Sequence, residues 1–321
     1  MRRIKSCGDI FSWSTSIKSA LLLAVAAAAM AAPAGAQQRG QKTFSSAEDA
    51  SSALVTAARN NDEKAMIDIL GPEGRSIVSS GDDAEDAEGR ASFVKRYEEM
   101  HRLVKEPDGT TVLYIGAENW PTPIPIVNKG SVWYFDTDTG KQEILYRRVG
   151  RNELSAIRVC QELAAAEKEY FASNHAYAQK IDSDEGQHDG LYWKMADGGP
   201  QSPIGPLVAA AVVGSSPNPT PYRGYYFHII TQQGKNAPGG AKSYLTGDKM
   251  TEGFAVVAYP AEYRSSGVMT FIVGPDGVVY EKDLGKKTDT AAKAMKEYNP
   301  DSSWKKTEEM QEEAAAGQTS K

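Results

Sequence analysis

Cysteine is nearly absent from this chain of 321 residues, which contains only Cys7 and Cys160. Cys7 lies in an N-terminal segment that we expect to be removed, so Cys160 is left alone. A single cysteine cannot form an intrachain disulfide, even in an oxidising compartment. Because Cys160 lies on an apolar stripe of a predicted helix, we interpret it as a buried core thiol rather than a reactive one.

Histidine is also scarce, and the spacings that carry common chemistries are missing. The histidines are His101, His175, His188 and His228. None belongs to an H-E-x-x-H pattern of zinc ligands. His228 occupies one position in the alternating pattern of a predicted strand, which favours a sheet residue over a general base. The sequence also lacks a Gly-x-Ser-x-Gly nucleophile elbow and a Gly-x-x-x-x-Gly-Lys phosphate loop. We therefore assign no catalytic, cofactor-binding or metal-ligating residue.

Long hydrophobic runs are missing beyond the first 36 residues. The N-terminus itself is basic, with Arg2, Arg3, Lys5 and Lys18. The apolar run at residues 20–32 is shorter than the ~20 residues that a membrane-spanning helix needs. Small residues, Ala34 and Ala36, follow at the spacing that a signal peptidase requires. We predict cleavage between Ala36 and Gln37, giving a periplasmic or secreted chain with no membrane insertion; an uncleaved anchor is the alternative.

An excess of positive charge is missing too. Loss of residues 1–36 removes four basic residues and one acidic residue, which takes the formal net charge from −6 to −9. Such a surface repels nucleic acid and anionic lipid, so we expect neither as a partner. No cysteine stands directly at the cleavage position, where Gln37 follows Ala36, and this argues against a lipoprotein anchor. The expected partner is an unknown small molecule or an envelope protein.

The first patterns present in the sequence are those of helices. After a polar linker at residues 37–44, Ser45 or Ser46 is placed to cap a helix that runs to Arg59. A second helix is predicted at residues 62–70, and apolar residues at helical spacing predict a third at residues 89–105. The acidic stretch at residues 79–88 predicts a solvated loop.

Strand patterns follow at residues 111–117, 124–127, 131–135 and 142–149. Residues 128–130 and 136–140 are predicted to form turns between them. Three helices followed by four strands predict an α+β domain over residues 45–149, with a curved antiparallel sheet. The runs Trp120-Pro-Thr-Pro-Ile-Pro-Ile-Val and Trp133-Tyr-Phe-Asp resemble the nuclear-transport-factor-2-like cone, which serves as a ligand pocket in some members and as an interaction surface in others.

A second domain is predicted over residues 150–304. It begins with a long helix at residues 152–178, whose two apolar stripes predict burial on two sides. The most strongly patterned part of the chain follows, with strands at residues 225–230, 253–259, 267–273 and 278–280. Tight turns are predicted at residues 237–241 and 274–277. A short helix is predicted at residues 288–295, and the charged tail at residues 305–321 is predicted to be disordered.

A long helix packed on a small antiparallel sheet is similar to the soluble part of a type IV pilin or pseudopilin. The likeness has a limit, because Gly150-Arg-Asn-Glu-Leu lacks the hydrophobic half and the peptidase site with which a pilin helix begins. Assembly into a filament by the usual route is therefore not expected.

Longer motifs connect the chain with one family. They include Gly224-Tyr-Tyr-Phe-His-Ile-Ile-Thr, Ala237-Pro-Gly-Gly-Ala, Phe254-Ala-Val-Val-Ala-Tyr-Pro and Asp189-Gly-Leu-Tyr-Trp. With them the chain resembles the bacterial secreted domain-of-unknown-function family 2950 over nearly all of its mature length. The resemblance implies no assigned activity and no catalytic residues.

Two acidic clusters carry oxygen atoms at a spacing that calcium loops use. The first is Asp136-x-Asp138-x-Gly140 with Glu143, and the second comprises Asp182, Asp184, Glu185 and Asp189. The first lacks the full calcium-loop pattern. We interpret the first as a hairpin turn and the second as a solvated loop, with calcium binding as the alternative for each.

Two classes of function remain open at this point. We favour a non-enzymatic envelope protein that serves as a binding or structural module. The alternative is an envelope hydrolase that uses carboxylates in the cone-like domain. A cavity that holds a buried carboxylate or histidine with a perturbed pKa would favour the enzyme, whereas a cavity lined by apolar and aromatic groups would favour binding.

Overall fold

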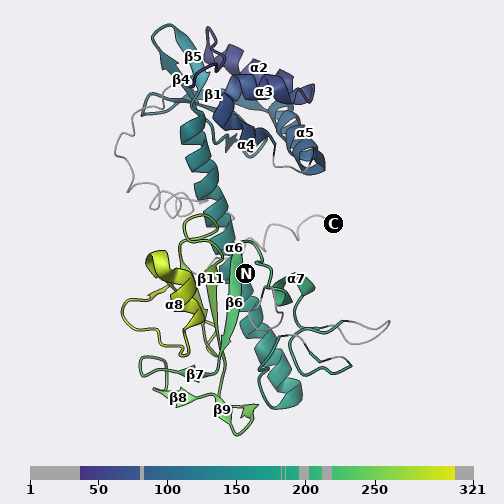
Figure 1. The fold of residues 1–321 in the computed structure, drawn as a ribbon, viewed down its shortest axis with the longest axis vertical. Helices are drawn as coiled ribbons and strands as arrows, with labels where there is room; N and C mark the ends of the chain where they lie inside the picture. Colours follow the sequence, from purple (N-terminus) through teal and green to yellow (C-terminus); the bar gives the residue numbers. More distant parts are fainter. Residues whose placement is uncertain are drawn as a thin grey trace, which may run out of the picture. The chain divides into compact units, whose positions relative to one another are not determined.

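The computed structural model describes residues 37–79, 83–181, 183–184, 186–194, 202–211 and 219–307 (Figure 1). Within these ranges, no helix combines the length and the apolar character needed to span a bilayer. Ala34 and Ala36 of the predicted cleavage site lie outside the described residues, as do Asp182 and Glu185 of the second acidic cluster and the tail from residue 308.

The fold is α+β and divides into two compact units, one ending at Ile144 and the other beginning at Leu145. Helix α6 (Thr137–Asn174) contains this boundary. Both units combine helices with antiparallel strands.

The first unit opens with helices that local sequence signals set in place. Helix α2 (Ala47–Arg59) is capped by Ser46, whose hydroxyl accepts a hydrogen bond of 3.0 Å from the backbone N–H of Asp49. Helix α3 (Glu63–Leu70) is capped in the same way by Asp62, at 2.9 Å from the N–H of Ala65. A 3-10 turn, η1 (Pro72–Gly74), and the short helix α4 (Arg75–Val78) follow. The first two predicted helices are therefore confirmed.

The third predicted helix is wrong at both ends. Helix α5 runs from Asp83 to Glu99, so part of the predicted acidic loop at residues 79–88 is helical. Acidic residues are stabilised at a helix N-terminus, where the helix dipole is positive. At the other end, residues 101–105 form strand β1 (His101–Lys105) instead of the last turns of the helix. Pairing of β1 with β2 across the sheet, with Leu103 opposite Leu113, outweighs the helical spacing of its apolar residues.

The sheet of the first unit has the order β1-β2-β4-β5, and the short strand β3 pairs with β2. All of its pairs are antiparallel. The strands are β2 (Thr111–Ile115), β3 (Trp120–Pro121), β4 (Ile126–Lys129) and β5 (Val132–Phe135). Gly130, with a φ of +70°, forms the turn between β4 and β5. The predicted strands at residues 111–117, 124–127 and 131–135 and the turn at residues 128–130 are thus confirmed, with shifted ends.

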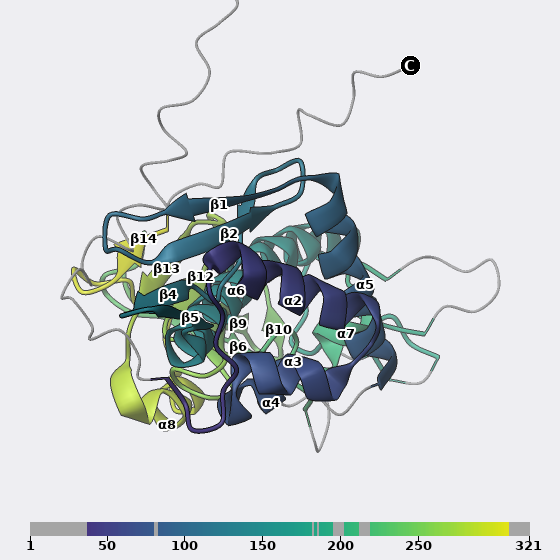
Figure 2. The ribbon, with the colours of Figure 1, turned by 90° about the horizontal axis from the view of Figure 1, so that it is seen from above.

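Helix α2 is central to this unit, because it packs against α3, α5, β4 and β5 (Figure 2). Its small residues, among them Ala50 and Ala57, are buried and let the neighbouring elements approach closely. Ile126 and Phe135 supply the sheet side of the same core.

The predicted strand at residues 142–149 is wrong, because these residues belong to α6. The predicted turn at residues 136–140 is also wrong, because it is the start of that helix. Asp136 is the reason: its carboxylate accepts hydrogen bonds from the N–H of Thr139 at 3.2 Å and from the Thr139 hydroxyl at 2.9 Å. An aspartate cap favours a helix over a hairpin. The long helix predicted at residues 152–178 therefore begins fifteen positions earlier, at Thr137, and ends at Asn174.

The second unit holds a sheet of order β14-β13-β12-β11-β6. Its strands are β6 (Tyr225–Ile230), β11 (Ala255–Pro260), β12 (Thr270–Val273), β13 (Val279–Lys282) and β14 (Lys305–Lys306). Val257 of β11 lies opposite His228 on one side and Ile272 on the other. The four predicted strands are confirmed, whereas Lys305 and Lys306 pair with β13 and so correct the start of the predicted tail.

Smaller elements complete the second unit. The hairpin turn at residues 274–277 and the glycine turn at residues 237–241 are confirmed, with positive φ at Gly277, Gly239 and Gly240. The remaining elements are α7 (Pro206–Ala209), β7 (Gln232–Gln233), β8 (Lys242–Ser243), β9 (Leu245–Thr246), β10 (Lys249–Met250), η2 (Gly285–Lys287) and α8 (Thr288–Lys293). Helix α8 confirms the prediction at residues 288–295.

Helix α6 packs against this sheet through a row of buried residues. Val159, Cys160 and Leu163 belong to the same apolar core as the strands. Cys160 is fully buried, and burial raises the pKa of its thiol above the ordinary value. The interpretation of Cys160 as a core residue is confirmed.

Candidate functional site

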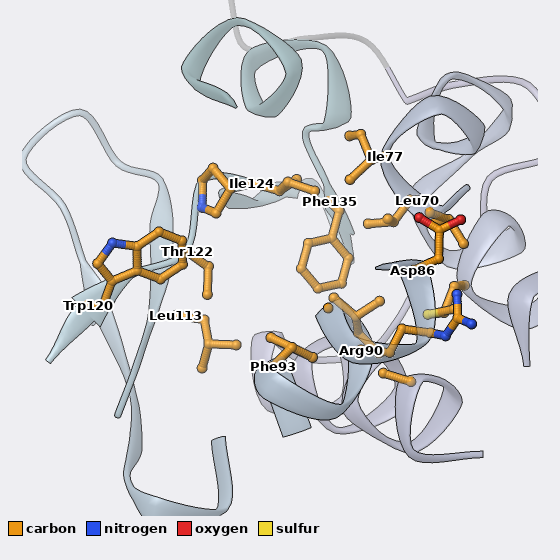
Figure 3. Close-up of a pocket in the computed structure, with 16 residues that line it drawn as sticks. Leu70, Ile77, Asp86, Arg90, Phe93, Leu113, Trp120, Thr122, Ile124 and Phe135 are labelled. Carbon is orange, nitrogen blue, oxygen red and sulfur yellow. The ribbon is translucent and has the colours of Figure 1, made fainter. Parts of the chain in front are cut away.

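The first unit contains a cavity of about 400 Å³ (Figure 3). Its walls come from helices α2 to α5 on one side and from the sheet and the loop before β4 on the other. The lining residues are Leu54, Ala58, Met66, Leu70, Ile77, Val78, Asp86, Gly89, Arg90, Phe93, Leu113, Trp120, Thr122, Pro123, Ile124 and Phe135. Apart from Asp86, Arg90 and Thr122, the side chains are apolar.

Helical spacing explains why these residues meet. Asp86, Gly89, Arg90 and Phe93 lie at positions i, i+3, i+4 and i+7 of α5 and therefore share one face. The pairs Leu54 and Ala58 of α2, and Met66 and Leu70 of α3, are each four residues apart. Helices α2, α3 and α5 thus each direct one face toward the cavity.

The sheet side of the cavity is apolar and aromatic. Leu113 and Phe135 are almost completely buried, whereas Trp120 is 40% exposed. Ile124 is held in place by the start of α6, since Gly140 packs directly against it. The sheet therefore supplies a buried floor, and Trp120 supplies an aromatic group that both cavity and solvent can reach.

Charged side chains lie on the helix side, across the cavity from Trp120 and Thr122 (Figure 3). Arg90 is oriented by a hydrogen bond of 2.9 Å from its Nε to the side-chain oxygen of Asn61. Asn61 has a φ of +51° in the connection between α2 and α3. One turn before Arg90, Asp86 contributes a carboxylate. A ligand would therefore meet apolar surface along most of its length and polar groups at one end.

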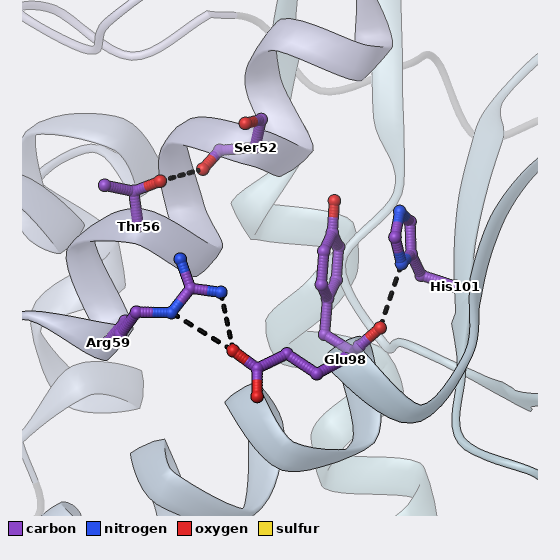
Figure 4. A network of polar contacts seen from close by, with 6 residues as sticks. Ser52, Thr56, Arg59, Glu98 and His101 are labelled. Atoms are coloured by element: carbon purple, nitrogen blue, oxygen red, sulfur yellow. Dashed lines mark hydrogen bonds and ion pairs between the residues drawn. The ribbon is translucent and has the colours of Figure 1, made fainter.

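A polar network at the surface ties α2 to α5 without reaching this lining (Figure 4). Arg59 donates two hydrogen bonds to one carboxylate oxygen of Glu98, from Nη2 at 2.7 Å and from Nε at 3.2 Å. His101 lies 2.9 Å through Nδ1 from the carbonyl oxygen of Tyr97 and stacks on its ring at 3.8 Å. Both Arg59 and Glu98 are about half exposed, so their ion pair contributes roughly 0–1 kcal/mol. The network positions α5 and offers no buried base.

The four histidines lie on four different segments of the chain. His101 is exposed on β1, His175 follows α6 with a φ of +53°, and His188 stacks on Trp193. His228 lies on β6, where burial lowers its pKa. None of them lines the cavity of the first unit, as far as the described residues extend. His228 is therefore a sheet residue, as the sequence predicts.

Three described residues of the acidic clusters, Asp136, Asp184 and Asp189, contact neighbouring residues. Asp136 caps α6, as described above. Asp184 and Asp189 both pair with Lys180, at 2.8 and 2.7 Å, and Lys180 lowers the pKa of Asp189. Across the described part of the chain, no three His, Cys, Asp or Glu side chains converge as metal ligands would.

One buried carboxylate was missed by the sequence analysis. Glu167 of α6 is fully buried, and its Oε2 accepts a hydrogen bond of 2.8 Å from the N–H of Ala178. Oε1 has no hydrogen-bond partner among the residues that the structure describes. Burial raises the pKa of Glu167 to about 8. Its spacing from Cys160 and Leu163, seven and four positions earlier, is the signal that could have revealed it.

Comparison with known proteins identifies one family. Its model, described as "Protein of unknown function (DUF2950)", matches residues 41–307. The match covers most of the chain, which therefore belongs to this family. No curated protein and no solved structure matches the chain significantly.

Proposed function

We propose that this member of the DUF2950 family is an exported, non-enzymatic binding protein whose first unit holds an apolar small molecule. The apolar cavity of about 400 Å³ carries this proposal. Ligand sites are concave and mostly apolar, with a few polar groups that fix orientation. Trp120 would cover the ligand from the sheet side, and Asp86 and Arg90 would contact its polar end.

The polar end is best matched by an uncharged group. Arg90 favours an acceptor and Asp86 favours a donor, and the two side chains lie one helical turn apart. An amide or a hydroxyl satisfies both, whereas a carboxylate would face Asp86. The expected ligand is therefore a predominantly apolar molecule with an uncharged polar head.

The hydrolase alternative receives less support from the same residues. Hydrolysis by paired carboxylates needs a second acidic group beside the first. Asp86 supplies the carboxylate in the described lining of this cavity, and Glu167 belongs to the core of the second unit. The arrangement supports binding better than acid–base chemistry.

The proposal includes two likenesses of architecture. A cavity between helices and an antiparallel sheet supports the likeness of residues 45–149 to the nuclear-transport-factor-2-like cone. A long helix against the order β14-β13-β12-β11-β6 supports the likeness of residues 150–304 to a soluble pilin-type domain. Both proposals concern similarity of fold and assign no activity.

Gly89 offers a direct test of the binding proposal. A Cβ atom at position 89 would meet no atom within 4 Å, and the position shares the cavity face of α5 with Phe93. Gly89→Leu should therefore fill part of the cavity while improving helix propensity by about 0.5–1 kcal/mol. We expect it to weaken binding of N-phenyl-1-naphthylamine, an uncharged fluorescent probe, at least tenfold.

Gly150→Leu is the matched control, because position 150 of α6 is equally open and lies outside the cavity lining. It should gain similar helix propensity and leave probe affinity unchanged. Equal probe affinity of both variants and the wild type would refute the assignment of the cavity. So would the absence of any increase in probe fluorescence with the wild-type protein.

Export is tested separately, at the N-terminus. Mass spectrometry of the protein recovered from the periplasm or medium should give Gln37 as the first residue. Ala36→Lys should block processing, because a signal peptidase requires a small residue there. Recovery of wild-type protein with residues 1–36 still attached would contradict this part of the proposal.

A further inference from the structure

A second cavity, of about 380 Å³, lies within the second unit. It is bounded by Tyr177 after α6, the turn after β7, the segment before β11, the β12–β13 hairpin and Tyr298. Unlike the cavity of the first unit, it is rich in charged and amide side chains. It shares no lining residue with the cavity of the first unit.

Tyr298 is the feature that points to a ligand. Its side chain is only 1% exposed, and its hydroxyl has no hydrogen-bond partner in the described part of the chain. The ring packs against Gly274, where a Cβ atom would lie 2.7 Å from Cε1, and this places the ring beside the cavity-lining Pro275 and Asp276. Burial raises the pKa of the phenol and Asp276 adds to the rise, so the hydroxyl keeps its proton. A buried hydroxyl without a partner is costly, and a ligand in the cavity that Tyr298 lines would supply the missing acceptor or donor once the side chain shifts toward it.

The other polar groups around the cavity are partly used. Gln233 donates through Nε2 to the carbonyl oxygens of Pro238 at 2.8 Å and Gly240 at 2.5 Å, which occupies both amide protons and leaves Oε1 as an acceptor. This pair of hydrogen bonds also fixes the glycine turn that forms one wall.

Lys242 and Asp276 have remaining capacity of opposite kinds. Lys242 donates to the carbonyl oxygen of Glu252 at 2.8 Å, and an ammonium carries two further protons. Asp276 accepts through Oδ1 from the N–H of Val278 at 3.1 Å, and its second oxygen can accept again. The cavity thus presents donors and acceptors together.

We infer that this cavity binds a small polyhydroxyl molecule, a saccharide of one or two rings. A hydroxyl group can accept from Lys242 and donate to Asp276 or Gln233, so a ring with several hydroxyls satisfies both kinds of group. Pro238, Pro275 and the ring of Tyr177 supply apolar surface for the C–H face of a sugar ring. An anion would face Asp276 and Glu252, and a cation would face Lys242, so an uncharged ligand fits best.

The test is ligand-observed saturation-transfer NMR on the full-length chain with D-glucose, N-acetyl-D-glucosamine and maltose. Succinate and putrescine are the anionic and cationic comparison probes. We expect saturation transfer to at least one of the three sugars and none to the charged probes. Transfer to a charged probe alone would overturn the ligand class, and the absence of transfer to any probe would overturn the site.

Two conservative variants localise the binding. Tyr298→Phe removes the hydroxyl and keeps the ring, and should weaken sugar binding at least tenfold. Tyr259→Phe is the matched control, because the Tyr259 hydroxyl is also buried without a partner in the described residues and lies outside the cavity lining. It should change affinity less than twofold. Both variants should keep the wild-type melting temperature or raise it, and equal affinity of the two variants would contradict the inference.

Discussion

Gly140 packs so closely against Ile124 that a Cβ atom at position 140 would lie 2.6 Å from Ile124 Cγ1 and 3.0 Å from its Cα. The contact joins the first turn of α6 to the wall of the apolar cavity. Because one of the two atoms belongs to the backbone, the contact cannot be relieved by a side-chain rotation alone. The size of residue 140 therefore sets the position of this wall.

Gly140→Ala should destabilise the first unit despite its better helix propensity. Overpacking costs about 1–3 kcal/mol, against a propensity gain of about 1 kcal/mol. Urea unfolding should show a lower midpoint and probe binding should weaken as Ile124 moves. Gly150→Ala, at an open helical position, should instead raise the midpoint. A Gly140→Ala protein as stable as Gly150→Ala would show that the wall is not tightly packed.

Asp136 should act as a helix cap and can be tested as one. Asp136→Ala removes the acceptor for Thr139 and should cost about 0.5–2 kcal/mol. Asp136→Asn keeps a side-chain oxygen and should retain most of the stability. The comparison is made by thermal melting with and without calcium. If calcium stabilises the wild type and neither variant, Asp136 ligates a metal and the cap is a secondary role.

Glu167 should make the stability of the second unit depend on pH. Its pKa is raised from 4.5 to about 8 on folding, so the folded state holds a proton that the unfolded state releases between these values. The contribution of Glu167 to the free energy of unfolding should be constant below about pH 4.5. It should fall as the pH rises from there to about 8, by about 1.4 kcal/mol per pH unit at most.

Glu167→Gln should flatten this profile, since the amide has no proton to release. Glu169→Gln, at an exposed position of the same helix, is the control and should leave the profile unchanged. Urea denaturation at a series of pH values measures both. A Glu167→Gln protein that keeps the wild-type slope would assign the pH dependence to another group.

Cys160 should be unreactive in the folded protein. It is fully buried, and burial raises the pKa of its thiol, so little thiolate forms near neutral pH. In a Cys7→Ser background, a thiol reagent such as DTNB should label Cys160 only after denaturation. A cysteine introduced at the exposed position Ser52 is the control and should react at once. Rapid labelling of native Cys160 would mean that the core around it opens.

Local signals made part of this fold predictable. Ser46 and Asp62 each cap a helix through an atom three residues away, so sequence alone identifies these starts. Clusters of β-branched and aromatic residues in β6, β11 and β12 likewise identify the strands of the second sheet. The motif around Asp136 shows the limit of such signals, because an acidic turn and a helix cap have similar sequences.

The other features of the fold depend on contacts between residues that are far apart in the sequence. Residues 101–105 carry a helical apolar pattern but become β1 because β2 is available to pair with them. The cavity was not predictable as a site, since its lining comes from four helices, three strands and the loop before β4, with no shared motif. Two of its residues, Asp86 and Gly89, fall where the sequence indicates a loop or a helix start.

Binding of an apolar molecule by the first unit is tested most directly by methyl NMR of the full-length chain during titration with N-phenyl-1-naphthylamine. Methyl resonances of Met66, Leu113 and Ile124, which line the cavity of the first unit, should shift and saturate together. Those of Ile230 and Ile272, in the core of the second unit, should stay in place. Unchanged resonances at Met66, Leu113 and Ile124 at saturating probe, or shifts confined to Ile230 and Ile272, would contradict the proposal that the first unit binds an apolar small molecule.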